Sequence, residues 1–572
     1  MGGENEEKRP EMMLGLLFAG ACVVFGVAYK VYGGWISRAL GIDDARPTPA
    51  VSERDGVDYE PGADAVVFGH HFSSIAGAGP IVGPITAAFA FGWLPAYLWI
   101  LLGAVFIGGV QDFTTMVASI RHKGESLAEI GKRAMGPFTY RLFLLFILLV
   151  LIYVIIVFLD MTAATFAPGG SAEDQATGGA VAMASVLYIA VAVLFSVARR
   201  YLRLPLWLAT VVFVPMVFLG LWAGMQWPLA ESMVPAFLGK AKYFWSAILL
   251  AYCLAASVLP VWVLLQPRDY LSSFLLYACL GAGVVGILAS PWTGAGSLQW
   301  PALRAWSTPN DGFIFPALCV MIACGAVSGF HAMIASGTTS KQLAKETSAQ
   351  KVGMGSMLIE GVLALLALAA VMILKDDPKM TPANVFAAGL AKLFSPFGMG
   401  EGALTGFAML AVSTFVLTTL DSCTRLSRII LQELLGVAKP GVLARVLLTC
   451  GVLLLPVLVC FKDIPGPGGA MMPAWKAVWP AFGATNQLMG AMALLMVFGW
   501  LRSEGRKSWF VGVPMVFMFA VTLSALAQII VKNFAQGGSA LLGGLSTVLF
   551  VLAVVVLADI VRHRGKPKYE EP

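Results

Sequence analysis

The chain has 572 residues, of which 58% are hydrophobic and only 12% are charged, and its formal net charge is +6. Soluble domains carry about 25% charged residues, so this composition excludes an ordinary soluble protein. The basic residues fall in short loops between apolar runs, so we expect no nucleic acid among the partners. The eight cysteines lie singly in apolar runs without a C-x-x-C pair, and neither a disulfide framework nor a zinc site is expected.

The chain is expected to be an all-α polytopic membrane protein surrounded by the lipid bilayer. A transmembrane helix needs about 20 apolar residues, and the sequence holds about 15 runs of this kind. The spans are expected at 12–31, 64–92, 93–118, 138–160, 179–197, 205–225, 243–266, 270–290, 313–335, 351–374, 402–421, 441–461, 476–500, 508–531 and 541–561.

Basic loops alternate along the chain and predict the orientation of the spans. Lysine and arginine concentrate in cytoplasmic loops of membrane proteins. Loops 121–137 and 199–204 are rich in them, whereas loop 168–178 carries Glu173 and Asp174 instead. We therefore expect the first two loops to be cytoplasmic and the third to be external, with the N-terminus outside and the C-terminus in the cytoplasm.

The segment 69–84, G-H-H-F-S-S-I-A-G-A-G-P-I-V-G-P, interrupts an apolar run with residues that break a helix. Gly77 and Gly79 weaken a helix, and Pro80 removes a backbone donor. Irregular backbone at membrane depth is tolerated only where it is buried in protein or lines a wet cavity. The segment therefore predicts a discontinuous helix at the substrate site of a transporter. A kinked packing helix without a ligand is the alternative.

A second breaker, S-V-L-P at 257–260, lies in the run 243–266, five spans after the first. An odd number of spans reverses the chain, so the two interrupted runs have opposite orientations. Interrupted helices in corresponding positions of two inverted halves indicate the binding site of a secondary transporter. We therefore expect residues 64–421 to form a ten-helix inverted-repeat core in which the broken helices face each other. Residues 1–63 are then a peripheral span and polar loop, and 422–572 are additional spans.

Six longer motifs resemble the carbon starvation protein A (CstA) family. They are G-H-H-F-S-S-I-A-G-A-G-P-I at 69–81, R-H-K-G-E-S-L at 121–127, L-Q-P-R-D-Y-L at 265–271, S-G-F-H-A-M-I-A-S-G-T-T-S-K-Q at 328–342, T-T-L-D-S-C-T-R at 418–425 and F-G-A-T-N-Q-L at 482–488. The resemblance implies a transporter, not an enzyme, that imports peptides or pyruvate with protons across the bacterial inner membrane. It also implies discontinuous helices in a LeuT-type five-plus-five inverted-repeat fold.

The expected ligand carries a carboxylate, because pyruvate and the C-terminus of a peptide both present one. Broken helix ends offer unpaired N–H groups and a partial positive charge to such an anion. The expected substrate-binding residues lie at the two breaks and on the turn before the first: His70, His71, Ser73, Ser74, Ala76, Gly77, Gly79, Ser257, Val258 and Leu259.

Glu360 is the strongest candidate for carrying the coupling proton. It lies near the middle of the apolar run 352–373 without a lysine or arginine within a turn. An ionised carboxylate at membrane depth is costly, so such residues often mark proton relays. The alternative is that Glu360 caps a broken helix. Asp112 and His70 are further candidates for proton coupling, and we expect no cofactor beyond the ion gradient.

Other polar side chains in the apolar runs have both a structural and a functional interpretation. Ser328, Thr338 and Thr339 are candidate sodium ligands, although hydroxyls also serve as packing contacts between membrane helices. The pairs Arg268 with Asp269 and Asp421 with Arg425 suggest gates or loop-closing salt bridges. The remaining residues of interest are Asn486 and Gln487, whose amides need partners in lipid, and His331, which we expect to be structural.

Two other functions fit part of the pattern. A membrane-embedded metal-dependent enzyme would use His70 and His71, but adjacent histidines chelate poorly on a helix, where i, i+4 spacing serves better. A sodium-coupled carrier is the second. We find neither the repeated filter motif of a channel nor a G-x-x-x-x-G-K-[ST] nucleotide loop. The choice between peptide, pyruvate and another carboxylate stays open.

Overall fold

The computed structural model describes residues 3–563 apart from 56–58, 133–135, 168–171, 230, 236, 261, 310, 378, 399, 438–439, 466–470 and 536–539. Within these residues, 13 helices are long and apolar enough to cross a membrane, and the bent pair Asp64–Ile75 and Gly79–Phe91 makes a fourteenth span. The expected all-α polytopic class is confirmed. The sequence predicts one span more, because the run expected at 313–335 forms two short helices.

The elements fall into three groups. The long helices are α1 (Gly3–Val27) with the π-helical turn η1 (Ala28–Gly33) and α2 (Gly34–Leu40), α6 (Trp93–Gly103) with η2 (Ala104–Gly108) and α7 (Gly109–Arg121), α9 (Pro137–Phe166), α10 (Ala172–Arg200), α11 (Leu206–Gln226), α12 (Ala241–Val258), α13 (Leu265–Thr293), η5 (Gln350–Met354) with α16 (Gly355–Met372), α18 (Glu401–Leu435), α19 (Val442–Cys460), α20 (Ala474–Ser503), α21 (Trp509–Ala535) and α22 (Ala540–His563). The halves of the broken spans are α4 (Asp64–Ile75), α5 (Gly79–Phe91), α14 (Ile314–Met321) and α15 (Gly329–Gly337). The short connecting elements are α3 (Pro49–Ser52), α8 (Leu127–Lys132), η3 (Glu231–Met233), η4 (Thr339–Lys341), α17 (Pro382–Phe394), η6 (Ser395–Phe397) and two antiparallel strand pairs, β1 (Ser307–Thr308) with β2 (Gly312–Phe313) and β3 (Ile464–Pro465) with β4 (Met471–Met472).

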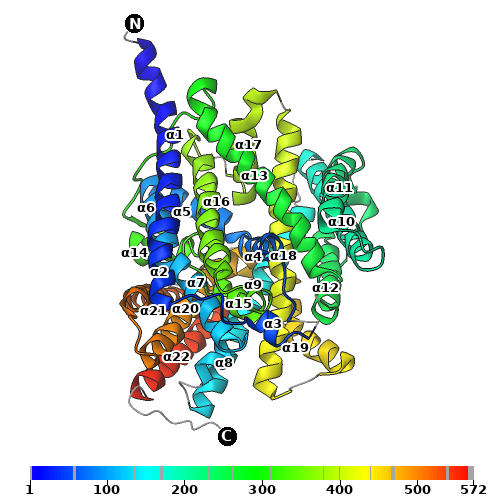
Figure 1. The fold of residues 1–572 in the computed structure, drawn as a ribbon. Helices are drawn as coiled ribbons and strands as arrows, with labels where there is room; N and C mark the ends of the chain where they lie inside the picture. Colours follow the sequence, from blue (N-terminus) through cyan, green and yellow to red (C-terminus); the bar gives the residue numbers. More distant parts are fainter. Residues whose placement is uncertain are drawn as a thin grey trace.

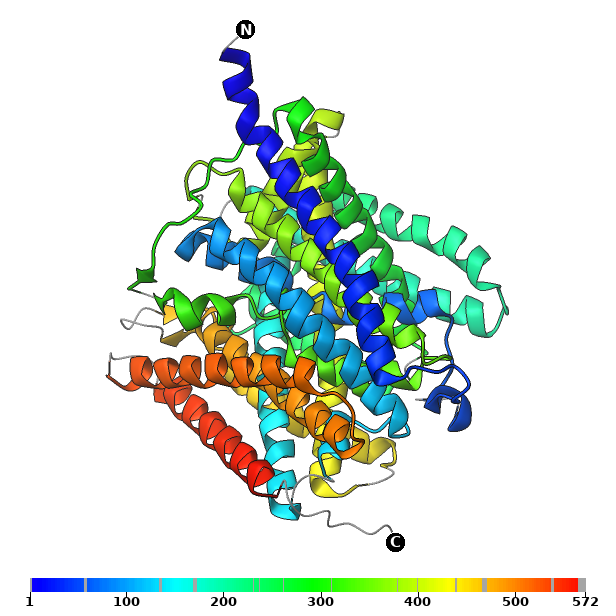
Figure 2. The ribbon, with the colours of Figure 1, turned by 60° about the vertical axis from the view of Figure 1, so that its left-hand side comes forward.

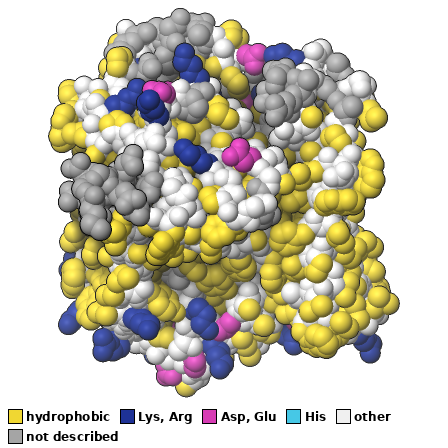
Figure 3. All heavy atoms as spheres, turned by 90° about the horizontal axis from the view of Figure 1, so that it is seen from above, with side chains coloured by type: hydrophobic (Ala, Val, Ile, Leu, Met, Phe, Trp, Pro, Cys, Tyr) yellow, Lys and Arg dark blue, Asp and Glu magenta, His cyan; other side chains and the backbone are white. Residues whose placement is uncertain are grey.

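Burial separates the central helices from the peripheral ones. In the most apolar stretch of α20, 94% of the residues are buried inside the protein, whereas the same measure is 17% for α11. Helix α1 runs along the outside of the bundle, and α10 with α11 forms a hairpin at its edge (Figures 1 and 2). On the face at the N-terminal end, hydrophobic side chains cover much of the surface, and Lys, Arg, Asp and Glu side chains lie among them (Figure 3). The functional site is therefore to be sought among α4, α5, α9, α13, α14, α15, α16, α18 and α20.

The first break lies where the glycines and prolines predict it. Helix α4 ends at Ile75, and α5 begins at Gly79 with Pro80 in its first turn, where the missing N–H costs no hydrogen bond. The two halves are bent by 40° relative to each other. Within the break, the Gly77 N–H donates to the Ile75 carbonyl at 2.8 Å.

The second break is not in 243–266, as the sequence predicts, but between α14 and α15. The S-V-L-P segment ends α12 at Val258, because a proline disfavours helical backbone at the residue before it, and Leu259 is extended with ψ of 150°. Helix α13 then starts at Leu265. By contrast, α14 ends at Met321 and α15 does not start until Gly329. Pro260 therefore terminates a helix where we expected it to interrupt one.

The contacts among helices repeat in two halves of the chain. In the first half α5 packs against α16, and in the second half α15 packs against α7 in the corresponding way. Similarly, α4 packs against α13, and α14 packs against α20. The contact of α12 with α18 corresponds to the contact of α19 with α9. The two equivalent helices α9 and α18 pack along each other. We therefore infer a five-plus-five repeat in which α4–α5, α6–α7, α9, α12 and α13 correspond to α14–α15, α16, α18, α19 and α20. The second half then extends to Ser503, beyond the expected boundary at 421, and α10 and α11 are an insertion.

The two breaks lie against each other in the centre of the bundle. A Cβ atom added to Gly79 would lie 2.4 Å from the Cys324 side chain, and one added to Gly83 would lie 2.6 Å from the Met321 carbonyl oxygen. These glycines let the backbone of α5 approach the end of α14 more closely than any side chain allows. The broken helices thus face each other, although the second is not the one that we expected.

This close approach predicts that Gly83→Ala destabilises the fold. The added methyl group meets backbone of α14, which cannot rotate away, so we expect a loss of about 1–3 kcal/mol, as for other overpacked cores. Thermal unfolding of the purified protein in detergent measures the effect. Gly20→Ala in α1 is the matched control, because nothing lies within 4 Å of its added Cβ. Equal unfolding temperatures for Gly83→Ala and the unsubstituted protein would show that the two breaks are not in contact.

Candidate functional site

The polar side chains of α4 point into the centre of the protein. His70, His71, Ser73 and Ser74 are all buried, at the C-terminal end of α4 just before the break. His70 and His71 are neighbours on the helix and so face directions about 100° apart. Each therefore belongs to a different group of polar residues.

His70 belongs to a buried group that we call the Arg268 cluster: His70, Tyr252, Arg268, Asp269 and Asp421. His70 Nδ1 lies 2.8 Å from Asp269 Oδ2, and Arg268 Nη2 donates to Asp269 Oδ1 at 2.5 Å. The same guanidinium donates to both carboxylate oxygens of Asp421, in one case at 2.9 Å. Arg268, Asp269 and Asp421 are completely buried. The cluster joins α4, α12, α13 and α18 around one guanidinium.

Tyrosine hydroxyls complete the Arg268 cluster. The Tyr252 hydroxyl donates to Asp421 Oδ2 at 2.8 Å and accepts from Arg268 Nη1 at 2.7 Å. The Tyr188 hydroxyl of α10 donates to the Arg268 main-chain carbonyl. The cluster still holds two carboxylates for one guanidinium, so its formal charge is negative unless a proton is present. Such an imbalance is costly in a buried site.

A second buried group, which we call the His331 cluster, consists of Asp112 on α7, His331 on α15 and Glu360 on α16. His331 Nδ1 lies 3.1 Å from Asp112 Oδ2, and His331 Nε2 lies 3.4 Å from Glu360 Oε2. The second distance is in ion-pair range but lacks hydrogen-bond alignment. Within the described residues, neither Glu360 oxygen has a hydrogen-bond partner. This glutamate is therefore not the helix cap that was its alternative role.

His71 and Gln111 connect neighbouring elements to the His331 cluster. His71 Nδ1 lies 2.9 Å from Thr339 Oγ1, in the turn η4 that follows α15. Gln111 Nε2 donates to Asp112 Oδ1 at 3.3 Å and to the Ser328 carbonyl. In the part of the chain that the structure describes, the Nε2 atoms of His70, His71 and His331 all lack hydrogen-bond partners.

The amides of α20 satisfy the backbone at the second break. Asn486 Oδ1 accepts from the Phe330 N–H at 2.9 Å, and Asn486 Nδ2 donates to Ser328 Oγ at 3.0 Å. Gln487 Nε2 donates to the carbonyl of Cys319 at 2.6 Å. These bonds pair groups that the interrupted helix leaves open. Asn486 and Gln487 therefore hold the broken span in place.

The remaining candidates take up different positions. Ser73 donates to the Asp269 carbonyl at 3.0 Å and so belongs beside the Arg268 cluster. Thr338 is engaged with the carbonyl of Ile334 in its own helix at 3.1 Å. Ser257 bonds to Thr449 of α19 at 3.1 Å, and the Leu259 carbonyl accepts from Arg425. Ser257, Val258 and Leu259 thus form the end of α12 against α18 and α19, and the expectation that they form the second break is wrong.

No arrangement for a metal ion is found among the described residues. No group of three or more His, Cys, Asp or Glu side chains there is placed to hold one. His70 and His71, the ligands of the metal-enzyme alternative, face different groups of side chains. The structure therefore adds nothing in favour of that alternative.

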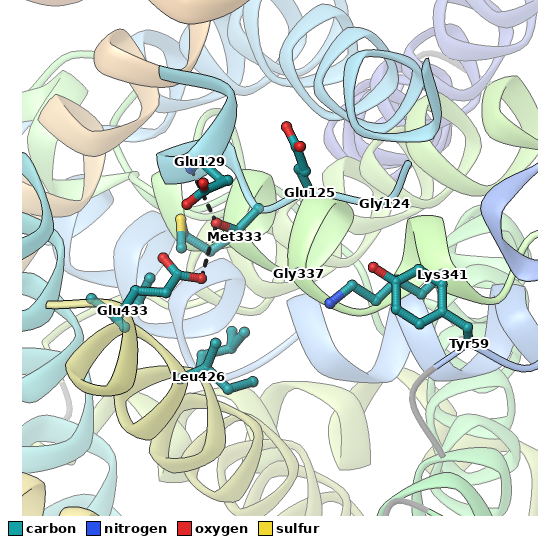
Figure 4. Close-up of a pocket in the computed structure, with 12 residues that line it drawn as sticks. Tyr59, Gly124, Glu125, Glu129, Met333, Gly337, Lys341, Leu426 and Glu433 are labelled. Atoms are coloured by element: carbon teal, nitrogen blue, oxygen red, sulfur yellow. Dashed lines mark hydrogen bonds between the residues drawn. The ribbon is translucent and has the colours of Figure 1, made fainter. Parts of the chain in front are cut away.

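A cavity of about 220 Å³ lies between α8, α15 and α18. Glu129 and Glu433 lie at one end, and Lys341 and Tyr59 lie at the other (Figure 4). The residues of the loop 124–126, which the basic-residue pattern predicts to be cytoplasmic, form part of its wall. Its apolar wall is made by Met333, Gly337, Leu426, Ile429 and Ile430 of α15 and α18. The cavity thus adjoins the two helices that carry His331 and Asp421.

Sequence reasoning missed how these groups come together. His331 was expected to be structural, yet it lies between Asp112 and Glu360. Asp421 was paired with Arg425 by its position in the chain, yet it binds Arg268, 153 positions away. Contacts over such separations follow from the packing of the helices, and no local spacing in the sequence encodes them.

Comparison with known proteins identifies the family of the chain. The profile of the family described as carbon starvation protein CstA matches residues 13–379 and 377–525. The chain is 33% identical to the "Peptide transporter CstA" of Helicobacter pylori, with 91% of this chain and 82% of that protein covered. It is 31% identical to the "Pyruvate/proton symporter BtsT" of Escherichia coli, with 88% of this chain and 80% of that protein covered.

Among solved structures, MhsT in complex with L-phenylalanine aligns over 86% of this chain and 99% of MhsT, with 13% identity and a TM-score of 0.49. The assignment rests on the sequence matches, which span most of the chain at more than 30% identity. On this basis, the chain belongs to the carbon starvation protein CstA family of membrane transporters.

Proposed function

We propose that this transporter imports a small carboxylate, such as pyruvate, or short peptides across the bacterial inner membrane, and that protons drive the uptake. Relatives named as a peptide transporter and as a pyruvate/proton symporter support both substrate classes. The two classes share a carboxylate group. The Arg268 cluster and the His331 cluster, whose side chains can bind carboxylates or protons, lie in the centre of the folded protein, where the broken helices meet.

The observation that carries proton coupling is the environment of Glu360. Its carboxyl group is completely buried, both oxygens lack hydrogen-bond partners within the described residues, and the nearest cationic candidate is His331 at 3.4 Å. A buried carboxylate without partners is costly as an anion and tolerable as a neutral acid. Glu360 therefore takes up a proton when His331 is neutral and gives it up when His331 or solvent accepts it.

His331 is suited to pass protons between two acids. Its Nδ1 faces Asp112 and its Nε2 faces Glu360. An imidazole accepts a proton at one nitrogen and releases one from the other. The chain Asp112–His331–Glu360 spans three helices of the repeat, so movement of α15 makes or breaks it. We assign Asp112 and His331 to the relay with Glu360.

Sodium coupling has weaker support in the geometry. Ser328 is bonded to Asn486, Thr338 to its own helix and Thr339 to His71. These hydroxyls satisfy neighbouring protein groups, and they do not converge on one point through any contact in the described residues. Sodium ligands would have to be freed from these partners first. We therefore favour the proton.

The topology expected from the basic loops is part of the proposal. A cysteine at Lys132, in α8, is then cytoplasmic, and one at Lys240, before α12, is external. Both side chains are exposed. Ser171, in the expected external loop, lies outside the described residues, so Lys240 is the better reporter of that side.

We expect an impermeant maleimide added to intact cells to label Lys240→Cys and to label Lys132→Cys only after permeabilisation. The unsubstituted protein is the control, because Cys450 is exposed in the structure. Labelling of Lys132→Cys in intact cells, with Lys240→Cys protected, would reverse the orientation.

The coupling ion is tested by uptake of labelled pyruvate and labelled dialanine into proteoliposomes. We expect accumulation with an inward pH gradient, loss of accumulation when a protonophore collapses the gradient, and no change when sodium is replaced by potassium. The reason is the buried acid–histidine relay beside hydroxyls that are already engaged. Accumulation that survives the protonophore but needs sodium would refute proton coupling.

Glu360→Gln separates the relay from a structural role. The amide keeps the shape of the side chain but carries no titratable proton, and it is cheaper to bury than a carboxylate. We expect the variant to fold and to exchange labelled for unlabelled substrate, while gradient-driven accumulation falls at least about tenfold, which corresponds to about 1.4 kcal/mol of lost driving force.

Ser356→Ala is the control for that substitution. It alters another buried side chain on α16, whose hydroxyl also lacks a hydrogen-bond partner among the described residues, and it should accumulate substrate normally. If Glu360→Gln accumulates substrate as well as this control does, Glu360 is not part of the proton relay.

A further inference from the structure

The Arg268 cluster contains one carboxylate more than its guanidinium needs. Arg268 is completely buried and already pairs with Asp269 through Nε at 3.2 Å and Nη2 at 2.5 Å. That pair alone is electrically neutral. Asp421 nevertheless binds the same guanidinium and is itself completely buried. Because an unbalanced buried charge is costly, the second carboxylate calls for a functional explanation.

Asp421 binds Arg268 as a free carboxylate would. Its two oxygens engage Nη1 and Nη2, one on each terminal nitrogen of the guanidinium. This two-pronged pairing is the preferred geometry of arginine with any carboxylate, whether it belongs to the protein or to a ligand. Asp421 therefore occupies a ready-made position for a carboxylate in the centre of the protein.

The Arg268 cluster adjoins the first break, since Ser73, on the last turn of α4, donates to the Asp269 carbonyl at 3.0 Å. Thr419, two residues before Asp421 on α18, donates to the Ser74 carbonyl at 3.3 Å. A Cβ added to Gly77 in the break would lie 2.6 Å from Thr419 Oγ1. The helix that carries Asp421 thus contacts the unwound backbone that we expect to bind an anion.

We propose that Arg268 anchors the carboxylate of the transported substrate, and that Asp421 occupies this place when the site is empty. This inference rests on the proposed function, since it concerns the same substrates. The substrate carboxylate binds the guanidinium as Asp421 leaves it, and Asp421 takes up one proton to become a neutral acid. One carboxylate and one proton enter together, so the charge of the site does not change.

The groups around Arg268 permit this exchange. Asp269 on α13 keeps the guanidinium paired throughout, and His70 on α4 holds Asp269 from its other oxygen at 2.8 Å. Tyr252 on α12 accepts a hydrogen bond from neutral Asp421 as readily as it now donates one. The Tyr188 hydroxyl on α10 is engaged with the Arg268 main chain. Asp421 is therefore the carboxylate of this cluster that can leave Arg268 and become neutral while Arg268 stays paired.

Calorimetry on the purified protein tests the anchor directly. The probes are acetate, pyruvate and dialanine, and the neutral counterparts are acetamide, pyruvamide and dialanine amide. We expect each acid to bind roughly 10- to 100-fold more tightly than its amide, the range expected for hydrogen bonds to a charged group. Arg268→Lys keeps the positive charge but lacks the two terminal N–H groups that pair with both oxygens of a carboxylate. This variant should therefore lose most of the preference for acids.

The role of Asp421 is tested by counting protons during binding. Titrations in two buffers of different ionisation enthalpy should show uptake of one proton per carboxylate. Since the bound state holds the extra proton, affinity must fall as pH rises, by up to about tenfold per pH unit. Asp421→Asn leaves the neutral Arg268–Asp269 pair intact, so it should fold, bind acids without proton uptake and lose this pH dependence.

Asp160→Asn is the matched control. It removes a buried carboxylate paired with Lys242 at 2.6 Å, in a salt bridge that is separate from the Arg268 cluster. This variant should keep both the proton uptake and the preference for acids. Its result shows whether loss of any buried carboxylate is enough to change the binding.

Several results would overturn the proposal. They are equal affinity for acids and amides, no binding of any of the three acids, an undiminished preference in Arg268→Lys, and full proton uptake in Asp421→Asn. If Asp421→Asn fails to fold, the Arg268→Lys comparison decides. Failure of the proposed function differs from these results: carboxylates would bind with proton uptake, but proteoliposomes would not accumulate pyruvate or dialanine.

Discussion

The structure depends on one constraint, that backbone left open at membrane depth must be satisfied inside the protein. Among the described residues two spans are interrupted, and each break has partners on another helix of the core. Gln487 donates to the carbonyl of Cys319, and Asn486 accepts from the Phe330 N–H. Thr419 binds the Ser74 carbonyl at the first break. Because these bonds cross between helices, the breaks hold the core together, and the irregular backbone is confined to the place where we propose that ligands bind.

The same low-dielectric centre makes its charged groups interdependent. Arg268 is tolerated because Asp269 and Asp421 surround it, and His331 is flanked by Asp112 and Glu360. In both clusters the carboxylates outnumber the permanent cations, so binding of protons is the simplest way to restore balance. An excess of buried acids is a poor way to stabilise a fold. It is a direct way to link proton binding to the position of helices.

Local chemistry in the sequence predicted the elements that depend on single residue types. The break at 76–78 followed from its glycines and prolines, and the apolar runs located the spans. The second break escaped prediction because residues 322–328 contain no proline, and their conformation depends on Asn486 and Gln487 from a distant helix. The S-V-L-P segment at 257–260 was predicted to interrupt a span, but it ends α12. A proline ends a helix as readily as it interrupts one, and the sequence does not distinguish the two. Glu360 and Asp112 were identified from the sequence as candidates for proton coupling, whereas the place of His331 between them required the packed structure.

Helix α4 connects the two clusters, and this arrangement bears on how transport could be coupled. His70 contacts Asp269 in the Arg268 cluster, and the next residue, His71, contacts Thr339 beside the helix that carries His331. Two adjacent residues on one helix turn together, so α4 cannot shift toward one cluster without changing its contact with the other. Glycines at 77 and 79 give α4 freedom to move independently of α5. Under the proposed mechanism, a proton gained in the His331 cluster and a carboxylate bound in the Arg268 cluster therefore act on the same short helix, which is what coupling between an ion and a substrate requires.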